Sequence, residues 1–199
     1  MQLSIETNFP EVQRKLDLLR TDIAAKAAAR AINRTIEQAK TQMGRQIRAE
    51  FMVDSRFVAQ RLRIKRATFF AGVLSVQATL DATAKTRSAN LARFGAKEVG
   101  LGVSVKIKRV GARKTVRGAF IGNKGRTVFE RVPGTRMASR KWGGKHGEQI
   151  KPVQTIDVPQ MFNTRRINAA VVAAMQSRFP AIFERELAYA LSQFNGGRA

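Results

Sequence analysis

The feature that most constrains the fold is a run of alternating apolar and polar residues near the middle of the sequence. From Leu101 to Ile107 every second residue is apolar, and a glycine, a serine or a lysine lies between. A period of two is expected of a strand that buries one face and exposes the other. Two shorter apolar runs, 116–121 and 127–132, lie on either side of turn-forming residues at 122–125. The stretch 99–132 therefore predicts a small antiparallel sheet.

Helical patterns lie on both sides of this sheet in the sequence. Apolar residues recur at helical spacing from Val12 to Ile47, in a segment rich in alanine, and a shorter helix is expected next, so that helices occupy most of 9–66. After Pro159 the spacing is again helical, and Pro180 either opens a second helix or kinks a single long one. The predicted fold class is α+β, a small antiparallel sheet flanked by long N-terminal and C-terminal helices.

The length of the chain fits one domain. With 199 residues, 44% of them hydrophobic, it is long enough to bury a core. We predict a single domain over 1–199, made in order of helices, a strand-rich basic region, a mobile basic loop and C-terminal helices: 9–66, 67–132, 133–149 and 159–195. Within the strand-rich region we expect one strand over 69–80 and a long loop over 81–96.

The charge of the chain is strongly one-signed. There are 37 Lys and Arg against 14 Asp and Glu, a net charge of +23, and Glu130 is the only acid between Val99 and Gly147. Such self-repulsion is usually relieved by a partner that brings counter-charge. Nucleic acid, a membrane surface and an acidic protein would each serve. Nucleic acid is favoured because the basic residues are spread along the whole chain, whereas a membrane-binding segment gathers them on one amphipathic helix.

The densest group of basic residues lies in the strands and loops of the predicted sheet. We interpret it as a candidate phosphate-contacting set: Lys106, Lys108, Arg109, Arg113, Lys114, Arg117, Lys124 and Arg126. No helix-turn-helix, zinc-finger or aromatic ribonucleoprotein motif accompanies it, so binding is expected to address the backbone and to depend strongly on salt. The glycine-rich loop supplies candidate partner-docking residues: Arg136, Arg140, Lys141, Trp142 and Lys145. Basic residues along the N-terminal helix, such as Arg34 and Arg45, are interpreted as a solvated face.

Residues for catalysis or metal binding are sparse. There is no cysteine, and the single histidine, His146, lies in the glycine-rich loop. The closest acidic pair, Glu184 and Glu186, sits two residues apart on a helix and so points to different faces. We therefore predict no catalytic residues, no metal site, no cofactor and no enzymatic activity.

The sequence contains no apolar run of roughly 18 residues and no charged-then-apolar leader. We expect a protein that is made in the cytoplasm and neither spans a membrane nor is secreted by a standard signal.

Several phrases, in order from about Ala28 to Leu191, resemble the minor tail protein Z family of tailed phages, the tail-completion proteins of lambdoid type. The matching phrases are Ala31–Arg34, Arg61–Thr68, Gly118–Ile121, Arg131–Val132, Ile150–Pro152, Ile156–Pro159 and Glu186–Leu191. The stretch from Asp81 to Val99 has no counterpart in the family's pattern. Within the second phrase, Arg61, Arg63, Lys65 and Arg66 become candidate DNA-facing residues because they are basic and lie in a match.

The resemblance implies a non-enzymatic virion protein of the tail or neck, made in the host cytoplasm. It implies a ring at the head-proximal end of the tail that joins tail to head and surrounds the DNA channel. The implied partners are copies of the chain itself, adjacent neck or connector proteins, tail-terminator or tail-tube proteins, and phage genomic DNA through sequence-independent contacts, with no membrane. The implied layout is also α+β.

Two alternatives stay open at this point. The chain would also suit a soluble, sequence-independent nucleic-acid-binding accessory protein, which should bind tightly as a monomer with a steep salt dependence. In the other alternative the charge serves protein contacts alone, and reversing Lys106, Lys108 and Arg109 to Glu would disturb assembly without affecting genome retention.

Overall fold

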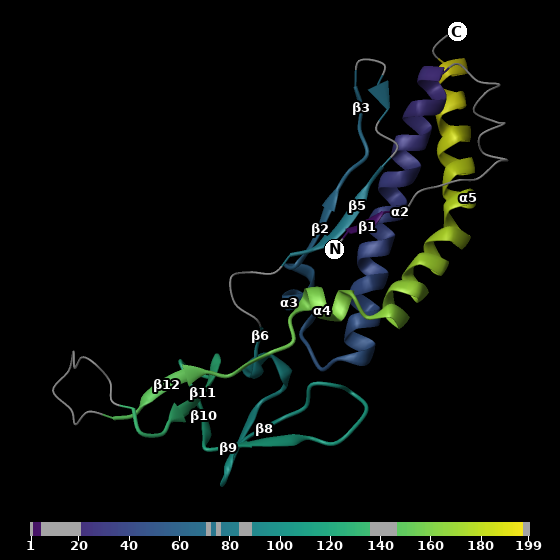
Figure 1. The fold of residues 1–199 in the computed structure, drawn as a ribbon. Helices are drawn as coiled ribbons and strands as arrows, with labels where there is room; N and C mark the ends of the chain where they lie inside the picture. The colour runs from purple at the N-terminus through teal and green to yellow at the C-terminus, as the bar shows by residue number, and fades with distance from the viewer. Residues whose placement is uncertain are drawn as a thin grey trace. The chain divides into compact units, whose positions relative to one another are not determined.

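The computed structural model describes residues 2–4, 21–70, 73–74, 77–83, 89–135 and 147–196. It is α+β, with long helices near both ends of the sequence and short antiparallel strands between them, which confirms the predicted fold class (Figure 1). No helix within these ranges is long and apolar enough to cross a bilayer.

The contacts group into two compact units. The first, here the helical unit, comprises Met1–Gln46, Ala59–Thr83 and Phe162–Ala199; the second, here the β unit, comprises Ile47–Val58 and Ala84–Met161. The single domain expected from the sequence remains a prediction.

The helical unit contains most of the long helix α2 (Thr21–Glu50). The apolar residues predicted to share one helical face are buried: Ala28, Ile32, Ile36, Ala39, Met43 and Ile47. This part of the predicted helix is confirmed, since alanine and straight-chain residues favour helix and the apolar stripe has a core to face. The part of the prediction before Thr21 lies outside the described residues.

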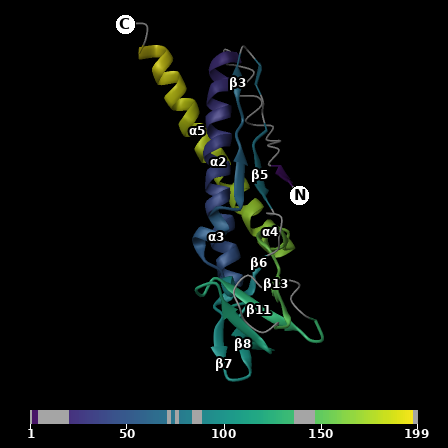
Figure 2. The same cartoon turned by 90° about the vertical axis from the view of Figure 1, so that its left-hand side faces the viewer.

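Helix α5 (Arg165–Gly196) runs without a break through Pro180. Of the two alternatives for Pro180, the structure therefore has a single long helix, although proline supplies no backbone N–H at that turn. Val171, Met175, Phe179 and Phe183 recur every fourth residue and are buried. Helices α2 and α5 run antiparallel alongside each other (Figures 1 and 2). Their contacts show the direction: Arg34 pairs with Glu186, whereas Arg30, earlier on α2, lies over the ring of Tyr189, later on α5.

Beside α2 lies a three-stranded antiparallel sheet in the order β1-β5-β2: Gln2–Ser4, Thr79–Ala82 and Leu62–Lys65. The prediction that helices extend to residue 66 is thus wrong for its last residues, which form β2. Leu62 and Ile64 alternate with Arg63 and Lys65, and this period of two lets the segment pair with β5.

The strand predicted over 69–80 is also wrong as a single element. It is divided among β3 (Phe69–Phe70), β4 (Val73–Leu74) and the first residues of β5. Strands β3 and β4 pair antiparallel, so they do not continue each other as one strand.

The β unit holds two three-stranded antiparallel sheets rather than the one predicted. One has the order β7-β8-β9, formed by Lys97–Val99, Gly102–Val105 and Lys114–Arg117. The other has the order β10-β11-β12, formed by Ala119–Gly122, Thr127–Val132 and Gln149–Pro152. Val103, Val105, Ala119, Val128 and Leu91 form their shared core.

The alternation that predicted the sheet is only partly reproduced. Val103 and Val105 are buried, but Leu101 is 71% exposed because it lies in the turn between β7 and β8. Ser104, expected to face water, is only 8% exposed. The reason is Arg113, whose guanidinium covers it through two hydrogen bonds to its hydroxyl and carbonyl oxygens.

The long loop predicted over 81–96 is wrong where the structure describes it. The short strand β6 (Ala89–Asn90) pairs with β13 (Gln154–Thr155), and a 3-10 helix, η1 (Leu91–Phe94), follows. The Asn90 side chain caps η1 by accepting from Ala92 N at 3.0 Å, and also bonds both backbone groups of Val128.

Two short helices complete the description. Helix α3 (Ser55–Ala59) follows α2, and α4 (Val158–Phe162) precedes α5. Helix α4 begins with a reciprocal cap, in which Asp157 Oδ1 accepts from the N–H of Val158 and Gln160 Oε1 accepts from the N–H of Asp157.

Candidate nucleic-acid interface

The β unit brings the predicted phosphate-contacting residues onto its strands and turns. Lys114 and Arg117 lie on the edge strand β9, opposite Val105 and Gly102 of β8 (Figure 1). Lys124 and Arg126 lie in the turn that joins β10 to β11, and Lys108 lies in the segment between β8 and β9. All five side chains are exposed, whereas Lys106 is half-buried.

The turn that carries Lys124 has an unusual backbone. Asn123 and Lys124 both adopt a positive φ, 53° and 54°, and Arg126 N donates to the carbonyl oxygen of Asn123. Two successive left-handed residues give the backbone twist that suits a tight connection between antiparallel strands. The local sequence Gly-Asn-Lys-Gly-Arg therefore holds two basic side chains, Lys124 and Arg126, at the tip of a hairpin.

Two of the predicted contact residues are bound to the protein itself. Arg113 donates to Ser104 Oγ at 2.9 Å, to the Ser104 carbonyl at 2.8 Å and to the Gly95 carbonyl at 2.6 Å. Arg109 donates from Nε to the carbonyl oxygen of Arg48 at 2.5 Å. Guanidinium groups held this way brace loops, so we leave both residues out of the proposed contact set.

The remaining five residues form what we call the exposed basic set: Lys108, Lys114, Arg117, Lys124 and Arg126. None of their side chains makes a hydrogen bond or an ion pair with another residue in the part of the chain that the structure describes. The nearby acids are already occupied. Glu130 pairs with Lys151 at 2.8 Å, and Glu98 accepts from the N–H of Ile121 at 2.8 Å.

A mainly apolar hollow of about 310 Å³ lies beside this set. Val105, Ile107 and Val110 contribute to its lining, together with Lys108 and Lys114. Val110 is 88% exposed, so the hollow opens among apolar side chains that water reaches.

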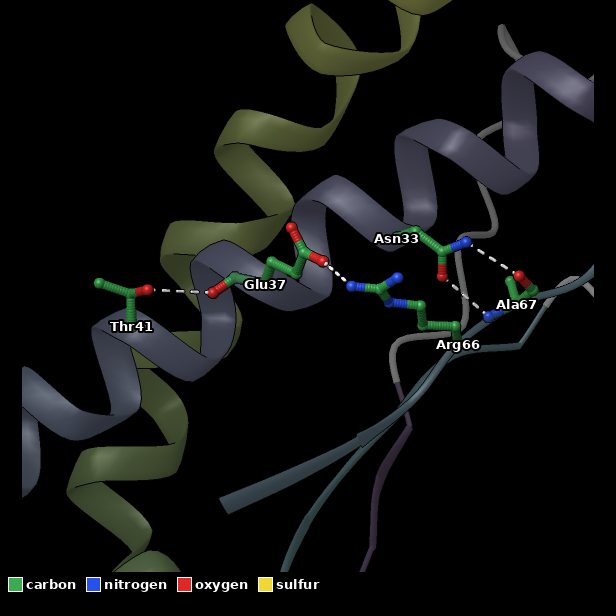
Figure 3. Close-up of polar contacts among 5 residues, drawn as sticks. All are labelled: Asn33, Glu37, Thr41, Arg66 and Ala67. Carbon is green, nitrogen blue, oxygen red and sulfur yellow. Dashed lines mark hydrogen bonds and ion pairs between the residues drawn. The ribbon is translucent and has the colours of Figure 1, made fainter. Parts of the chain in front are cut away.

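The four candidates taken from the second matching phrase lie in the helical unit. Arg61 is only 9% exposed, which removes it from any phosphate-facing surface. Arg63 and Lys65 are exposed on β2, and Arg66 pairs with Glu37 of α2 at 2.5 Å (Figure 3). The structure therefore does not gather these four side chains into one site.

The predicted docking residues Arg136, Arg140, Lys141, Trp142 and Lys145 lie outside the described residues, as does His146. Among the described residues, no three side chains of His, Cys, Asp or Glu cluster closely enough to hold a metal ion.

The basic residues of α5 were not among the predicted site residues. Arg178 and Arg185 lie beside Arg34 and Arg45 of α2 around one hollow of the helical unit. Their spacings, seven residues on α5 and eleven on α2, place each pair on one helical face, which was a signal in the sequence. Only the pairing of the two helices reveals that these faces meet.

Comparison with known proteins assigns the family. The family model for prophage minor tail protein Z matches residues 11–195 of the 199 residues. No curated protein and no solved structure is significantly similar to the chain. The match covers nearly the whole sequence, including α2, all but the last residue of α5, and all the strands from β2 onward. The chain therefore belongs to the prophage minor tail protein Z family and is a structural protein of phage tails.

Proposed function

We propose that this tail protein forms a ring at the head-proximal end of the tail, where it completes the tail and allows it to join the head. The observation that carries the proposal is the family match over residues 11–195. We further propose that the role is structural and not catalytic. The neighbours in this arrangement are other copies of the chain, adjacent neck or connector proteins, and tail-terminator or tail-tube proteins of the virion.

We propose that the ring surrounds the DNA channel and contacts the genome without regard to its sequence. The exposed basic set supports this, because its five cations have no carboxylate partner among the described residues. Lysine and arginine that meet phosphates neutralise backbone charge, whichever bases are present. A channel that passes a whole genome requires contacts of this kind.

Exposed apolar residues of the β unit support self-association. Leu101 is 71% exposed and Val99 is 42% exposed, and both lie at the hairpin of β7 and β8. Apolar residues at a hairpin tip lose contact with water when a neighbouring subunit covers them. We propose that this hairpin contributes to the contact between subunits.

The proposal is tested by two measurements on the full-length protein. Light scattering across salt and protein concentration gives the native mass, and addition of the protein to extracts that lack it measures tail-to-head joining. We expect a defined closed oligomer and restored joining. A protein that stays monomeric and fails to restore joining contradicts the proposal. Tight DNA binding by that monomer, with a steep salt dependence, favours the free nucleic-acid-binding protein instead.

A further inference from the structure

The helical unit contains a groove between its two long helices that the proposed DNA contact does not use. It is a hollow of about 430 Å³, and Arg34 and Arg45 of α2 line it together with Arg178 and Arg185 of α5. A neighbouring hollow of about 350 Å³ shares Arg34 and Glu37 with it. The two hollows together form what we call the arginine groove.

The acids of the arginine groove are already paired. Glu186, whose side chain is 3% exposed, accepts from Arg34 at 2.8 Å, and Glu37 accepts from Arg66 at 2.5 Å (Figure 3). The side chains of Arg45, Arg178 and Arg185 are exposed and make no hydrogen bond or ion pair with any other described residue. Three guanidinium groups around one hollow repel one another, and an anionic ligand would relieve that repulsion.

The spacing of these arginines indicates the form of that ligand. Arg178 and Arg185 lie seven residues apart on one helix, which is about 10 Å along its axis. Carboxylates seven residues apart on another helix have the same separation. The groove between two packed helices is also the shape that receives the ridge of a third. We propose that the arginine groove binds an acidic helical segment of another protein, whose carboxylates recur every two turns.

Nucleic acid fits this groove less well. Duplex DNA is read by protruding elements that enter its own grooves, whereas this surface is a hollow between two helices. A single strand is held by aromatic side chains on which its bases stack, but the one aromatic among the described residues that line the two hollows is Tyr189, and Arg30 already lies over its ring. The planar fork of arginine matches a carboxylate, and one arginine of this groove, Arg34, already pairs with the carboxylate of Glu186.

A second copy of this chain is also a poor occupant. With only 14 acids against 37 basic residues, it offers no segment rich in carboxylates. The partner is therefore a different and acidic protein, and the inference does not depend on whether the β unit contacts DNA.

The test measures binding of a labelled probe by fluorescence anisotropy near physiological salt. The probe is a capped, alanine-based helical peptide with glutamates seven residues apart, and a 20-base-pair DNA duplex is measured in parallel. The groove variant carries R45Q, R178Q and R185Q. The matched control carries K114Q, K124Q and R126Q, which removes the same charge from the β unit.

We expect the groove variant to weaken peptide binding by about tenfold or more, which corresponds to roughly 1.4 kcal/mol. The matched control should change peptide binding by less than about twofold, because its charges act only at long range through screening salt. A glutamine version of the peptide should bind neither protein. A variant with R178K and R185K keeps the charge and loses the fork, so its affinity should fall between those of the wild type and the groove variant.

Three results would overturn the inference. Equal losses in the groove variant and the matched control would show attraction to net charge alone. A loss of DNA affinity in the groove variant as large as its loss of peptide affinity would make the groove a phosphate-binding surface. Failure of the wild-type protein to bind the glutamate peptide more tightly than the glutamine peptide would exclude the proposed ligand. If the groove variant does not fold, the lysine variant, which keeps the charge, is compared with the wild type, and an unchanged peptide affinity would overturn the inference.

Discussion

The Asn33 side chain joins two segments that are 34 residues apart in the sequence. Its Nδ2 donates to the Ala67 carbonyl at 2.8 Å, and its Oδ1 accepts from the Ala67 N–H at 2.9 Å (Figure 3). Ala67 is 3% exposed, so replacing Asn33 with alanine leaves two buried backbone groups without these bonds. We expect N33A to lower the free energy of unfolding by about 2–3 kcal/mol. Urea denaturation followed by circular dichroism measures the change.

Thr41 provides the matched control for N33A. It lies on the same helix, and its hydroxyl donates at 3.1 Å to the Glu37 carbonyl four residues earlier, at an exposed position. T41A should change stability by less than about 0.5 kcal/mol. Similar losses in the two variants would show that the bonds to Ala67 contribute little.

Within the predicted phosphate-contacting set, replacing Arg113 should lower the stability of the protein, whereas replacing Lys124 should not. Arg113 makes three hydrogen bonds to the protein, whereas Lys124 makes none with a described residue. We expect R113A to lower the free energy of unfolding by about 1–2 kcal/mol, and K124A to leave it within about 0.5 kcal/mol. Thermal unfolding compares them. Equal stability of the two variants would mean that Arg113 does not brace Ser104 in solution.

At the scale of elements, Gly102 is the residue that allows β8 to pair with β9. Its φ is +148°, and a Cβ atom at this position would lie 2.1 Å from the carbonyl oxygen of Val116. Since the backbone cannot move aside cheaply, we expect G102A to lower the free energy of unfolding by about 3 kcal/mol or more.

Gly44 of α2 is the opposite case, with nothing within 4 Å of its Cβ position. G44A should stabilise the protein by about 0.5–1 kcal/mol. Denaturation midpoints should fall for G102A and rise for G44A. A G102A variant as stable as the wild type would refute the strand pairing at Gly102.

The elements differ in how far the sequence could predict them. Helix α2 was predictable because its apolar period extends over many turns, and each turn adds the same evidence. The segment 62–65 was not, since four residues beside a helix fit either period and only pairing with β5 selects the strand. The segment 89–94 was missed because its structure depends on the bonds from Asn90 to Val128, 38 residues away.

The residues of the candidate sites also differ in whether local sequence or distant contacts determine their role. The exposed basic set was predictable, because charged residues at turns and edge strands reach the surface without help from distant residues. The internal roles of Arg109 and Arg113 were not, since their acceptors are mostly backbone carbonyl oxygens, which no sequence pattern marks. The arginine groove required the antiparallel pairing of α2 and α5, which residue spacing on either helix alone does not specify.

At the scale of the whole molecule, the single domain predicted from the sequence has a thermodynamic consequence. Three helices, α2, α3 and α4, have residues in both compact units. Loss of either unit would therefore interrupt a helix, and we expect the two to unfold in one cooperative transition. N33A in the helical unit and G102A in the β unit should each lower the midpoint of that one transition. Calorimetry tests this, and separate transitions, each sensitive to only one variant, would indicate two domains.

The proposed contact with DNA predicts how the affinity for DNA depends on salt concentration. Each phosphate contact releases counterions, so the logarithm of the affinity falls with the logarithm of the salt concentration by about 0.9 for each contact to duplex DNA. Glutamine at all five positions of the exposed basic set should reduce this slope by up to about 0.9 for each residue that meets a phosphate. The groove variant should keep most of the slope, because its three arginines lie in the helical unit. Titrations of the assembled protein at several salt concentrations measure both slopes. If the five substitutions leave the slope unchanged while the groove variant lowers it, the genome meets the helical unit, and the acidic partner proposed for the arginine groove is wrong at the same time.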